Sequence, residues 1–324
     1  MDATPTLKAA LGASPLLYPL DIDAQGEFVQ FVRLSEADYS AASFLDHTML
    51  AAGQRVAPVA WAEVAAASTG LPIHCDFIFH ISHVGSTLLS RLLGEHPALF
   101  SVREPTILRR LAMGKFPDRW EVFLGLWSRT FDPQQKAIIK ASSFVNAIAE
   151  QLLERVDNSR AVLMYVPART FIAAMLDGAT GDIERLAAER AARLQQLVRL
   201  PPSLLHGHSA GEQVAMSWLA EMLSLQRTAE RFPERTLWLD FDAFLEDTAQ
   251  HLSRVLRHLG VDDDCHRLLA ANTLERYAKR PEVEYNAAFR QRLLAQAHAK
   301  WAAEVARGLA WLESTLPHLP PLQG

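Results

Sequence analysis

The 324-residue sequence predicts a three-layer α/β fold, in which a parallel β-sheet carries helices on both faces. Short apolar runs recur along the chain and alternate with longer segments of helical periodicity. Strands that are separated by helices pair in parallel through crossover connections, so this alternation favours a parallel sheet. The hydrophobic fraction of 49% and the charged fraction of 21% fit a protein with a sizeable buried core.

A small N-terminal extension precedes this sheet. Two extended runs on either side of Ala24-Gln25-Gly26 predict a hairpin: residues 16–23 and 27–34. An alanine-rich helical pattern follows from Ser43 to Ser68 and is broken at Gly70. We therefore expect an extension of hairpin and helix over residues 1–70, packed on a main domain over residues 71–324.

The main domain carries the alternating pattern. Four short apolar runs have the length and composition of buried strands: residues 75–81, 137–140, 161–166 and 236–241. The segments between and after them predict helices: residues 86–95, 106–114, 118–130, 145–156, 182–200, 212–232 and 248–259. Parallel strands that are covered on both faces are apolar throughout, so we expect helices on each side of the sheet.

The overall charge and the cysteine count exclude several classes of protein. The net charge of −5 does not favour a nucleic-acid partner or an anionic membrane surface. Two cysteines, Cys75 and Cys265, are too few for a disulfide framework or a zinc site. Residues 1–14 lack the pattern of a signal peptide, and no apolar run has the length of a membrane span. We therefore expect a cytoplasmic protein.

The first strand leads into its helix through Ser82-His83-Val84-Gly85-Ser86-Thr87. A glycine lets the backbone approach an anion closely, and the free N–H groups at the start of a helix point towards it. The same residues also suit a plain tight turn with a helix cap, so the loop alone leaves both interpretations open. It is not a Walker A loop, because the lysine that such a loop requires is absent.

The segment from Phe77 to Leu93 resembles the opening of the sulfotransferase family, together with Glu95-His96-Pro97 and Arg103-Glu104-Pro105. In that family an apolar strand leads into a loop with the order proline, basic residue, serine, glycine, threonine, threonine. A leucine-rich helix, a histidine-proline pair and a glutamate follow. Within the family, the sequence is most similar in this pattern to tyrosylprotein sulfotransferases and their bacterial relatives.

Three later segments keep the order of the same family. Ile138 to Ser142 resembles its lysine-bearing strand end, and Leu163 to Arg169 resembles its strand and loop for the donor's 3′-phosphate. Leu239 to Asp247, followed by Leu256 to Gly260, resembles its late strand and helix. The resemblance thus covers roughly residues 75–260 and implies a P-loop-type α/β fold.

The resemblance implies transfer of a sulfuryl group from 3′-phosphoadenosine 5′-phosphosulfate to a hydroxyl or amine of a small-molecule or peptide acceptor, without a metal. By position, Glu104 would be the catalytic base, Lys140 would stabilise charge on the transferred group, and His83 would assist. The donor would be bound by Ser82, His83, Val84, Gly85, Ser86, Thr87 and Arg169. Arg103 and Arg109 would fix the carboxylate of Glu104 or contact the donor.

The sequence departs from the family at both ends of the donor site. His83 replaces the basic residue of the loop, and an imidazole is fully charged only when it is protonated. Val166 and Ala174 stand where the family has the arginine and serine that bind the 3′-phosphate. Arg169 and the arginines of the 182–200 helix are candidate substitutes. A basic loop over Tyr277 to Pro281 is either a closing loop or plain surface.

Several polar residues have a structural interpretation. Glu184, Arg185, Glu189, Arg190 and Arg193 alternate in sign and predict a solvated helix face with i,i+4 ion pairs. Ser142 and Ser143 predict a cap for the helix that follows them. The tryptophans at 120 and 127 suit either an acceptor pocket or the core.

Two other functions remain open from the sequence. One is a nucleotide-dependent phosphotransferase on the same fold, although the lysine that bridges the outer phosphates in P-loop enzymes is absent. The other is a non-catalytic protein that keeps the fold and binds an anion or a partner. The sequence does not indicate an oligomeric state.

Overall fold

A five-stranded parallel sheet forms the centre of the molecule, with the strand order β5-β6-β4-β7-β8. The strands are β4 (Cys75–His80), β5 (Leu99–Arg103), β6 (Lys136–Lys140), β7 (Ala161–Tyr165) and β8 (Thr236–Asp240). The computed structural model describes residues 6–47, 54–178, 183–198, 200, 201, 204, 209–262, 264–270 and 287–319. Since all neighbouring strands of this sheet are parallel, their C-terminal ends meet at one edge.

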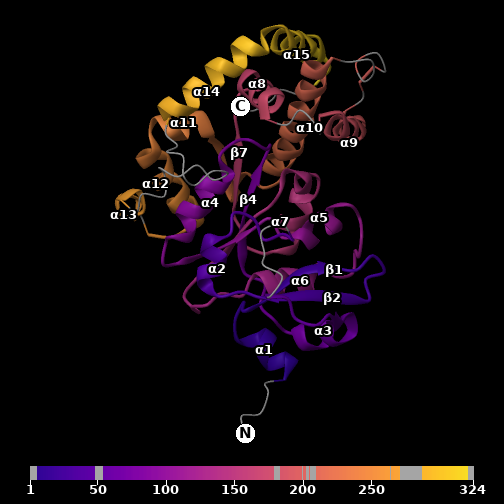
Figure 1. The fold of residues 1–324 in the computed structure, drawn as a ribbon, viewed down its shortest axis with the longest axis vertical. Coiled ribbons are helices and arrows are strands. Elements are labelled where there is room, and N and C mark those ends of the chain that lie inside the picture. The colour runs from indigo at the N-terminus through magenta and orange to yellow at the C-terminus, as the bar shows by residue number, and fades with distance from the viewer. Residues whose placement is uncertain are drawn as a thin grey trace.

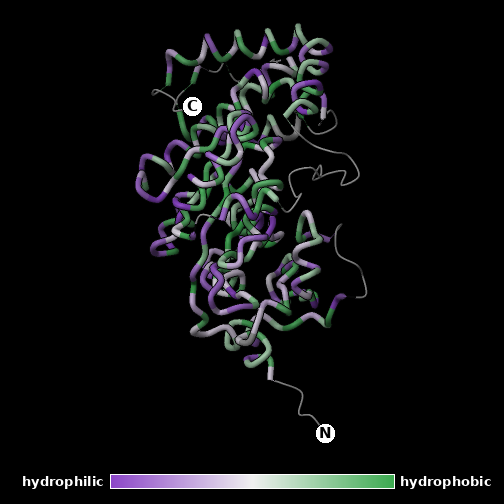
Figure 2. Tube along the Cα trace, turned by 90° about the vertical axis from the view of Figure 1, so that its left-hand side faces the viewer, coloured by the Kyte–Doolittle hydropathy of each residue, from purple (hydrophilic) through white to green (hydrophobic). Residues whose placement is uncertain are grey.

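Helices cover both faces of this sheet, which confirms the predicted fold class (Figure 1). One face carries α4 (Ser86–Gly94), α12 (Thr248–Leu259) and α13 (Cys265–Ala270). The other face carries the 3₁₀ helix η2 (Ser143–Ile148), α7 (Ala149–Arg155) and α10 (Ala210–Arg231). Figure 2 shows hydrophobic residues gathered along the middle of the molecule, where β4, β6 and β7 are almost entirely buried.

The sequence patterns found four of the five strands of this sheet and missed β5. All five residues of β5 are buried, but Ser101 and Arg103 interrupt its apolar pattern. Their partners lie elsewhere in the chain. The Ser101 hydroxyl shares a hydrogen bond of 2.7 Å with the Ser90 hydroxyl of α4, and the Arg103 guanidinium donates to the Tyr39 carbonyl. These partners satisfy the Ser101 hydroxyl and Nη2 of Arg103, although Nε of Arg103 has no partner among the described residues. The strand can therefore be buried without a purely apolar sequence.

A three-stranded antiparallel sheet lies at the opposite end of the molecule from α14 and α15 (Figure 1). It contains β1 (Leu17–Ile22), β2 (Phe28–Arg33) and β3 (Val59–Ala60), flanked by α1 (Leu7–Ala13), α2 (Glu36–Ala41) and α3 (Trp61–Ser68). The predicted hairpin is therefore confirmed. Buried Arg129 contributes to holding this part in place, because its guanidinium donates to the carbonyls of Leu11, Ser14 and Leu17.

The prediction of a helix from Ser43 to Ser68 is wrong over most of the residues that the structure describes. Of the described residues in this range, Trp61–Ser68 form the α-helix, while residues 48–53 lie outside the described part of the chain. The Val56 amide donates to the Phe31 carbonyl and Val59–Ala60 pairs with β2, so pairing with the sheet overrides the helical propensity of the alanines. Pro58 also disfavours a continuous helix here.

The remaining elements of the described chain complete the two helical layers. They are α5 (Thr106–Ala112), α6 (Trp120–Trp127), α8 (Ala168–Gly178), α9 (Ile183–Leu197), η4 (Pro233–Arg235), α11 (Phe241–Glu246), α14 (Ala287–Lys300), α15 (Ala302–Thr315) and η6 (Leu316–His318). Trp120 and Trp127 are both buried in the core, so they do not line an open pocket. Within the described ranges, no helix has both the length and the apolar character that crossing a bilayer requires.

Candidate active site at the C-terminal edge of the sheet

The loop between β4 and α4 has three residues in the left-handed region of backbone conformation. Ser82 has a φ of 77°, His83 a φ of 55° and Gly85 a φ of 64°. Left-handed residues that lie close together in sequence turn backbone N–H groups towards a common concave side, which is a typical anion-binding arrangement. Gly85 is the N-cap of α4, and no side chain of the described residues caps the helix there. The first N–H groups of α4 therefore remain available to an anion.

Gly85 is also required by packing. A Cβ atom on Gly85 would lie 2.0 Å from the ring of Phe241, the first residue of α11. Ser86 and Thr87 open α4 beside it and are nearly buried. The loop thus packs directly against Phe241 at the start of α11.

Glu104 and Lys140 meet at the ends of two neighbouring strands. Glu104 follows β5 with a φ of 53°, and its amide donates to the Lys140 carbonyl at 2.7 Å. The Lys140 ammonium is buried and donates to Oε1 of Glu104. Burial lowers the pKa of Lys140, and the Glu104 carboxylate acts in the opposite direction. Two of the three residues predicted to be catalytic, Glu104 and Lys140, are therefore in direct contact.

Arg109 of α5 is the second cation at Glu104. Its Nη2 lies 3.3 Å from Oε2 of Glu104, and its Nε donates to the Ser142 hydroxyl at 3.1 Å. Arg103, in contrast, points to the carbonyl of Tyr39 in α2, so the expectation that it fixes Glu104 is wrong. In a strand, successive side chains point to opposite faces. The side chain of Arg103 leaves the sheet on the α2 side, away from the carboxylate.

His80, the last residue of β4, is a site residue that the sequence patterns missed. Its Nδ1 accepts the Ser82 amide at 3.1 Å, so in the neutral ring the proton is on Nε2. That Nε2 lies 3.9 Å from Oε1 of Glu104 and has no hydrogen-bond partner in the described chain. Burial and nearby Lys140 hold the pKa of His80 well below its ordinary value, whereas the backbone of Ala141 acts in the opposite direction.

The ends of three strands thus place an anion-binding loop beside a carboxylate and two cations. Two half-buried rings line the same region. The Phe44 ring lies 5.2 Å from the Lys140 ammonium, and the Phe144 ring lies 5.4 Å from the Arg109 guanidinium. Such a site can bind an anionic group and accept a proton from a second molecule.

Ser142 and Ser143 serve this site rather than capping a helix. Neither side chain caps η2; the Ser142 hydroxyl accepts from Arg109, and the Ser143 hydroxyl accepts from Ser82 at 2.7 Å. The predicted helix cap is therefore wrong. Ser143 links the loop to the layer of helices behind it, because it also accepts from Arg190 at 3.3 Å.

The other predicted donor ligands, His83 and Arg169, lie on the side of the loop that faces α8 or on α8 itself. His83 is half-buried, with its ring against Gly178 at the end of α8. Arg169 is exposed on α8, and burial together with the charge of Arg169 lowers the pKa of His298 on α14. Val166 is fully buried, and its carbonyl accepts the indole N–H of Trp218 at 3.0 Å. The Tyr277–Pro281 loop lies outside the described residues.

Arg190 and Arg193 do not form the solvated face that the charge alternation predicts. Both pair with the fully buried Glu221 of α10, at 2.9 Å from Arg190 Nε and 3.1 Å from Arg193 Nη1. Asn146 of η2 donates to the same carboxylate at 2.7 Å and to the His80 carbonyl at 2.9 Å. This buried network joins α9 and α10 to the end of β4.

Replacing Glu221 by glutamine is expected to destabilise the fold by about 3–5 kcal/mol, because the buried guanidinium of Arg190 and the partly buried one of Arg193 lose their shared counter-charge. The substitution preserves the shape of the side chain, so it tests charge rather than packing. Urea unfolding measures the effect as a lower midpoint at an unchanged slope. A decrease of less than about 1 kcal/mol in the free energy of unfolding would instead show that these ion pairs contribute no more than solvent-exposed ones.

No family model matches the chain, and none of the curated proteins matches it in sequence. Solved structures similar to it include a sulfotransferase from Alicyclobacillus acidocaldarius, with 16% identity, coverage of 75% of this chain and 96% of that one, and a TM-score of 0.42. The sulfotransferase domain of the curacin biosynthetic pathway has 14% identity, coverage of 78% and 99%, and a TM-score of 0.42. A mouse sulfotransferase in complex with PAP has 11% identity, coverage of 63% and 66%, and a TM-score of 0.35.

These similar structures are sulfotransferases, the family that the loop motif resembles. At such identities and TM-scores, the similarity does not assign an activity to this chain. The particular closeness to tyrosylprotein sulfotransferases stays a prediction.

Proposed function

We propose that the chain transfers a sulfuryl group from 3′-phosphoadenosine 5′-phosphosulfate to a hydroxyl or amine. The observation that supports this most directly is the contact between Glu104 and Lys140 beside the loop Ser82 to Thr87. The N–H groups of the loop and of α4 would bind the 5′-phosphosulfate. Sulfuryl transfer also requires a base for the acceptor proton next to a cation, and Glu104 and Lys140 would supply these two groups.

In the proposed reaction, the acceptor oxygen or nitrogen forms a bond to sulfur while the bond from sulfur to the 5′-phosphate oxygen breaks. The acceptor proton passes to Glu104, and adenosine 3′,5′-bisphosphate leaves. Lys140 and Arg109 stabilise the negative charge on the transferring group. The half-buried Phe44 and Phe144 rings favour a small-molecule or peptide acceptor with an apolar body next to its nucleophile.

The residues fit the two ends of the donor unequally. The loop suits the 5′-phosphosulfate, whereas Val166 is fully buried and neither it nor Ala174 carries a polar side chain for the 3′-phosphate. Arg169 is the basic residue on α8 that lies nearest to Val166 and Ala174 in sequence, and its side chain is exposed. Binding measurements must therefore separate recognition of the 5′ end from recognition of the 3′ end.

Thermal unfolding with different nucleotides tests the proposal. A ligand that binds the native state raises the melting temperature through linkage. We expect stabilisation by the phosphosulfate donor and by adenosine 3′,5′-bisphosphate, and none by ATP with magnesium. Stabilisation by ATP with magnesium alone would favour a phosphotransferase, and no response to any of them would favour a non-catalytic relative. Adenosine 5′-phosphate in the same series shows how much affinity the 3′-phosphate adds.

Two substitutions at His80 are expected to separate loop binding from catalysis. Asparagine keeps an acceptor near the position of Nδ1 for the Ser82 amide but removes the Nε2 donor that faces Glu104. Glutamine keeps a donor near Nε2 and removes the acceptor. We therefore expect H80N to lower kcat by about tenfold or more and to retain the affinity for the bisphosphate. We expect H80Q to weaken bisphosphate binding by a larger factor than it lowers kcat. Equal losses in both variants would reduce His80 to a packing role.

A further inference from the structure

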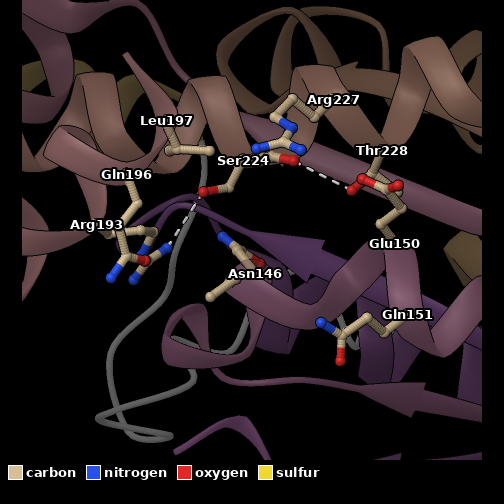
Figure 3. A pocket seen from close by; sticks show the side chains of 10 residues that line it. Asn146, Glu150, Gln151, Arg193, Gln196, Leu197, Ser224, Arg227 and Thr228 are labelled. Carbon is tan, nitrogen blue, oxygen red and sulfur yellow. Dashed lines mark hydrogen bonds between the residues drawn. The ribbon is translucent and has the colours of Figure 1, made fainter. Parts of the chain in front are cut away.

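A polar cavity of about 270 Å³ lies between α9 and α10 on one side and η2 and α7 on the other (Figure 3). Apart from Ala147 and Leu197, every residue that lines it has a polar or charged side chain. Figure 3 shows Arg193, Arg227 and Ser224 along one side, with Glu150 and Gln151 across from Arg193. A cavity of this composition suits a polar ligand rather than an apolar one.

Two arginines and one glutamate carry the charges that line this cavity. Arg193 shares the carboxylate of Glu221 with Arg190, and Nη1 of Arg190 also lies 3.7 Å from Oε2 of Glu189. Arg227 of α10 lies one turn after Ser224 and is exposed, and no carboxylate pairs with it in the described part of the chain. Two arginines from two helices therefore face one cavity, an arrangement that favours an anionic group with paired oxygens.

The remaining polar groups favour a ligand that also carries hydrogen-bond donors. Half-buried Glu150 of α7 can accept from a hydroxyl or an ammonium group. The hydroxyls of Ser224 and Thr228 donate to the carbonyls of Ala220 and Ser224, at 2.7 Å and 3.1 Å. The Ser224 oxygen also accepts from Arg193 at 3.4 Å, and each hydroxyl oxygen keeps a lone pair for a donor from the ligand.

This cavity is distinct from the loop and from Glu104. Asn146 lines it, and the amide of Asn146 donates to the His80 carbonyl and to Glu221. The layer of Asn146, Glu221 and Arg190 thus lies between the cavity and the loop, because Arg190 reaches the loop through Ser143. Arg193, one of the arginines of the 182–200 helix that the sequence offers as substitute ligands of the 3′-phosphate, lines the cavity, whereas Glu104, Lys140, Arg169 and the loop from Ser82 to Thr87 do not.

We propose that this cavity is a second ligand site, which binds a small anionic metabolite that has a carboxylate or phosphate group and at least one hydroxyl or ammonium donor. Arg227 and Arg193 bind the anionic group, and Glu150 binds the donor. This inference does not depend on the proposed sulfuryl transfer.

Calorimetric titration with two probes tests the proposal. Citrate and glycerol 3-phosphate both combine an anionic group with hydroxyls, so they represent the carboxylate and the phosphate class. We expect at least one of them to bind the full chain in the millimolar range or tighter, and R227Q to weaken that binding by about tenfold or more. R231Q is the matched control: Arg231 is exposed on the same helix and pairs with Glu154 outside the cavity. It should change the affinity by less than about twofold.

Binding of citrate alone assigns the site to carboxylates, and binding of glycerol 3-phosphate alone assigns it to phosphates. Q196E is a second variant, because it introduces a negative charge at an exposed position of the lining and should weaken either probe. The proposal is overturned if neither probe binds the wild type. It is equally overturned if R227Q and Q196E bind as the wild type does, since the anion would then occupy another place such as the loop after β4.

Discussion

Replacing Glu104 by glutamine is expected to abolish sulfuryl transfer while leaving the binding of adenosine 3′,5′-bisphosphate intact. Glutamine has the shape of glutamate but does not accept the acceptor's proton, and the loss of a general base costs about 10²–10⁴ in rate. The loop that binds the 5′ end is untouched by the change. Turnover is measured with the phosphosulfate donor, and bisphosphate binding is measured by calorimetry. Unchanged turnover would remove Glu104 as the base.

The same substitution is expected to move the pH dependence of bisphosphate binding. Burial already lowers the pKa of Lys140, and the Glu104 carboxylate is the group that opposes this shift. Without that carboxylate the pKa of Lys140 falls further, so the ammonium is lost at a lower pH. Because the ammonium favours the anion, binding to E104Q should weaken at a lower alkaline pH than binding to the wild type.

R109Q is the control for both measurements at Glu104. It removes a cation from the same carboxylate but leaves Glu104 in contact with Lys140. We expect R109Q to lower turnover much less than E104Q and to leave the alkaline limit of bisphosphate binding close to that of the wild type. If R109Q and E104Q were equally inactive, proton transfer would not be the step that Glu104 serves.

The parts of the site that the sequence predicted are local. The loop from Ser82 to Thr87 and Glu104 come just after β4 and β5, and Lys140 ends β6, so the parallel topology brings them together. The parts that it missed depend on partners that are distant in sequence. His80 looked like an ordinary strand residue until Glu104 and the Ser82 amide were placed against it. No periodicity along the chain shows such a contact.

Arg190 and Arg193 show that a sequence pattern can also predict an exposed surface where the structure has a buried contact. Arg190 and Arg193 fit a solvated helix face by spacing, yet they are directed at Glu221 on another helix. A charge pattern gives the same periodicity whether it faces water or a buried counter-charge. Only the packing of α9 on α10 distinguishes the two.

Replacing Gly85 by alanine is expected to destabilise the fold by about 2–5 kcal/mol, since two costs add there. The first is the φ of 64°, which an alanine rarely adopts. The second is the new Cβ at 2.0 Å from the ring of fully buried Phe241. Unfolding in urea measures the total loss, and bisphosphate binding measures the damage to the loop.

Gly114 separates these two costs. It has a φ of 73°, but a Cβ there would have no heavy atom within 4 Å, so G114A carries the backbone cost without the clash. We expect G114A to cost only about 1–2 kcal/mol, and the excess of G85A over it to report the contact with Phe241. In G85A, the further change F241L should recover part of that excess, with a coupling energy of about 1–3 kcal/mol. If G85A and G114A were equally destabilising, Phe241 would yield to the added methyl group, and packing against Phe241 would not be what holds the loop in shape.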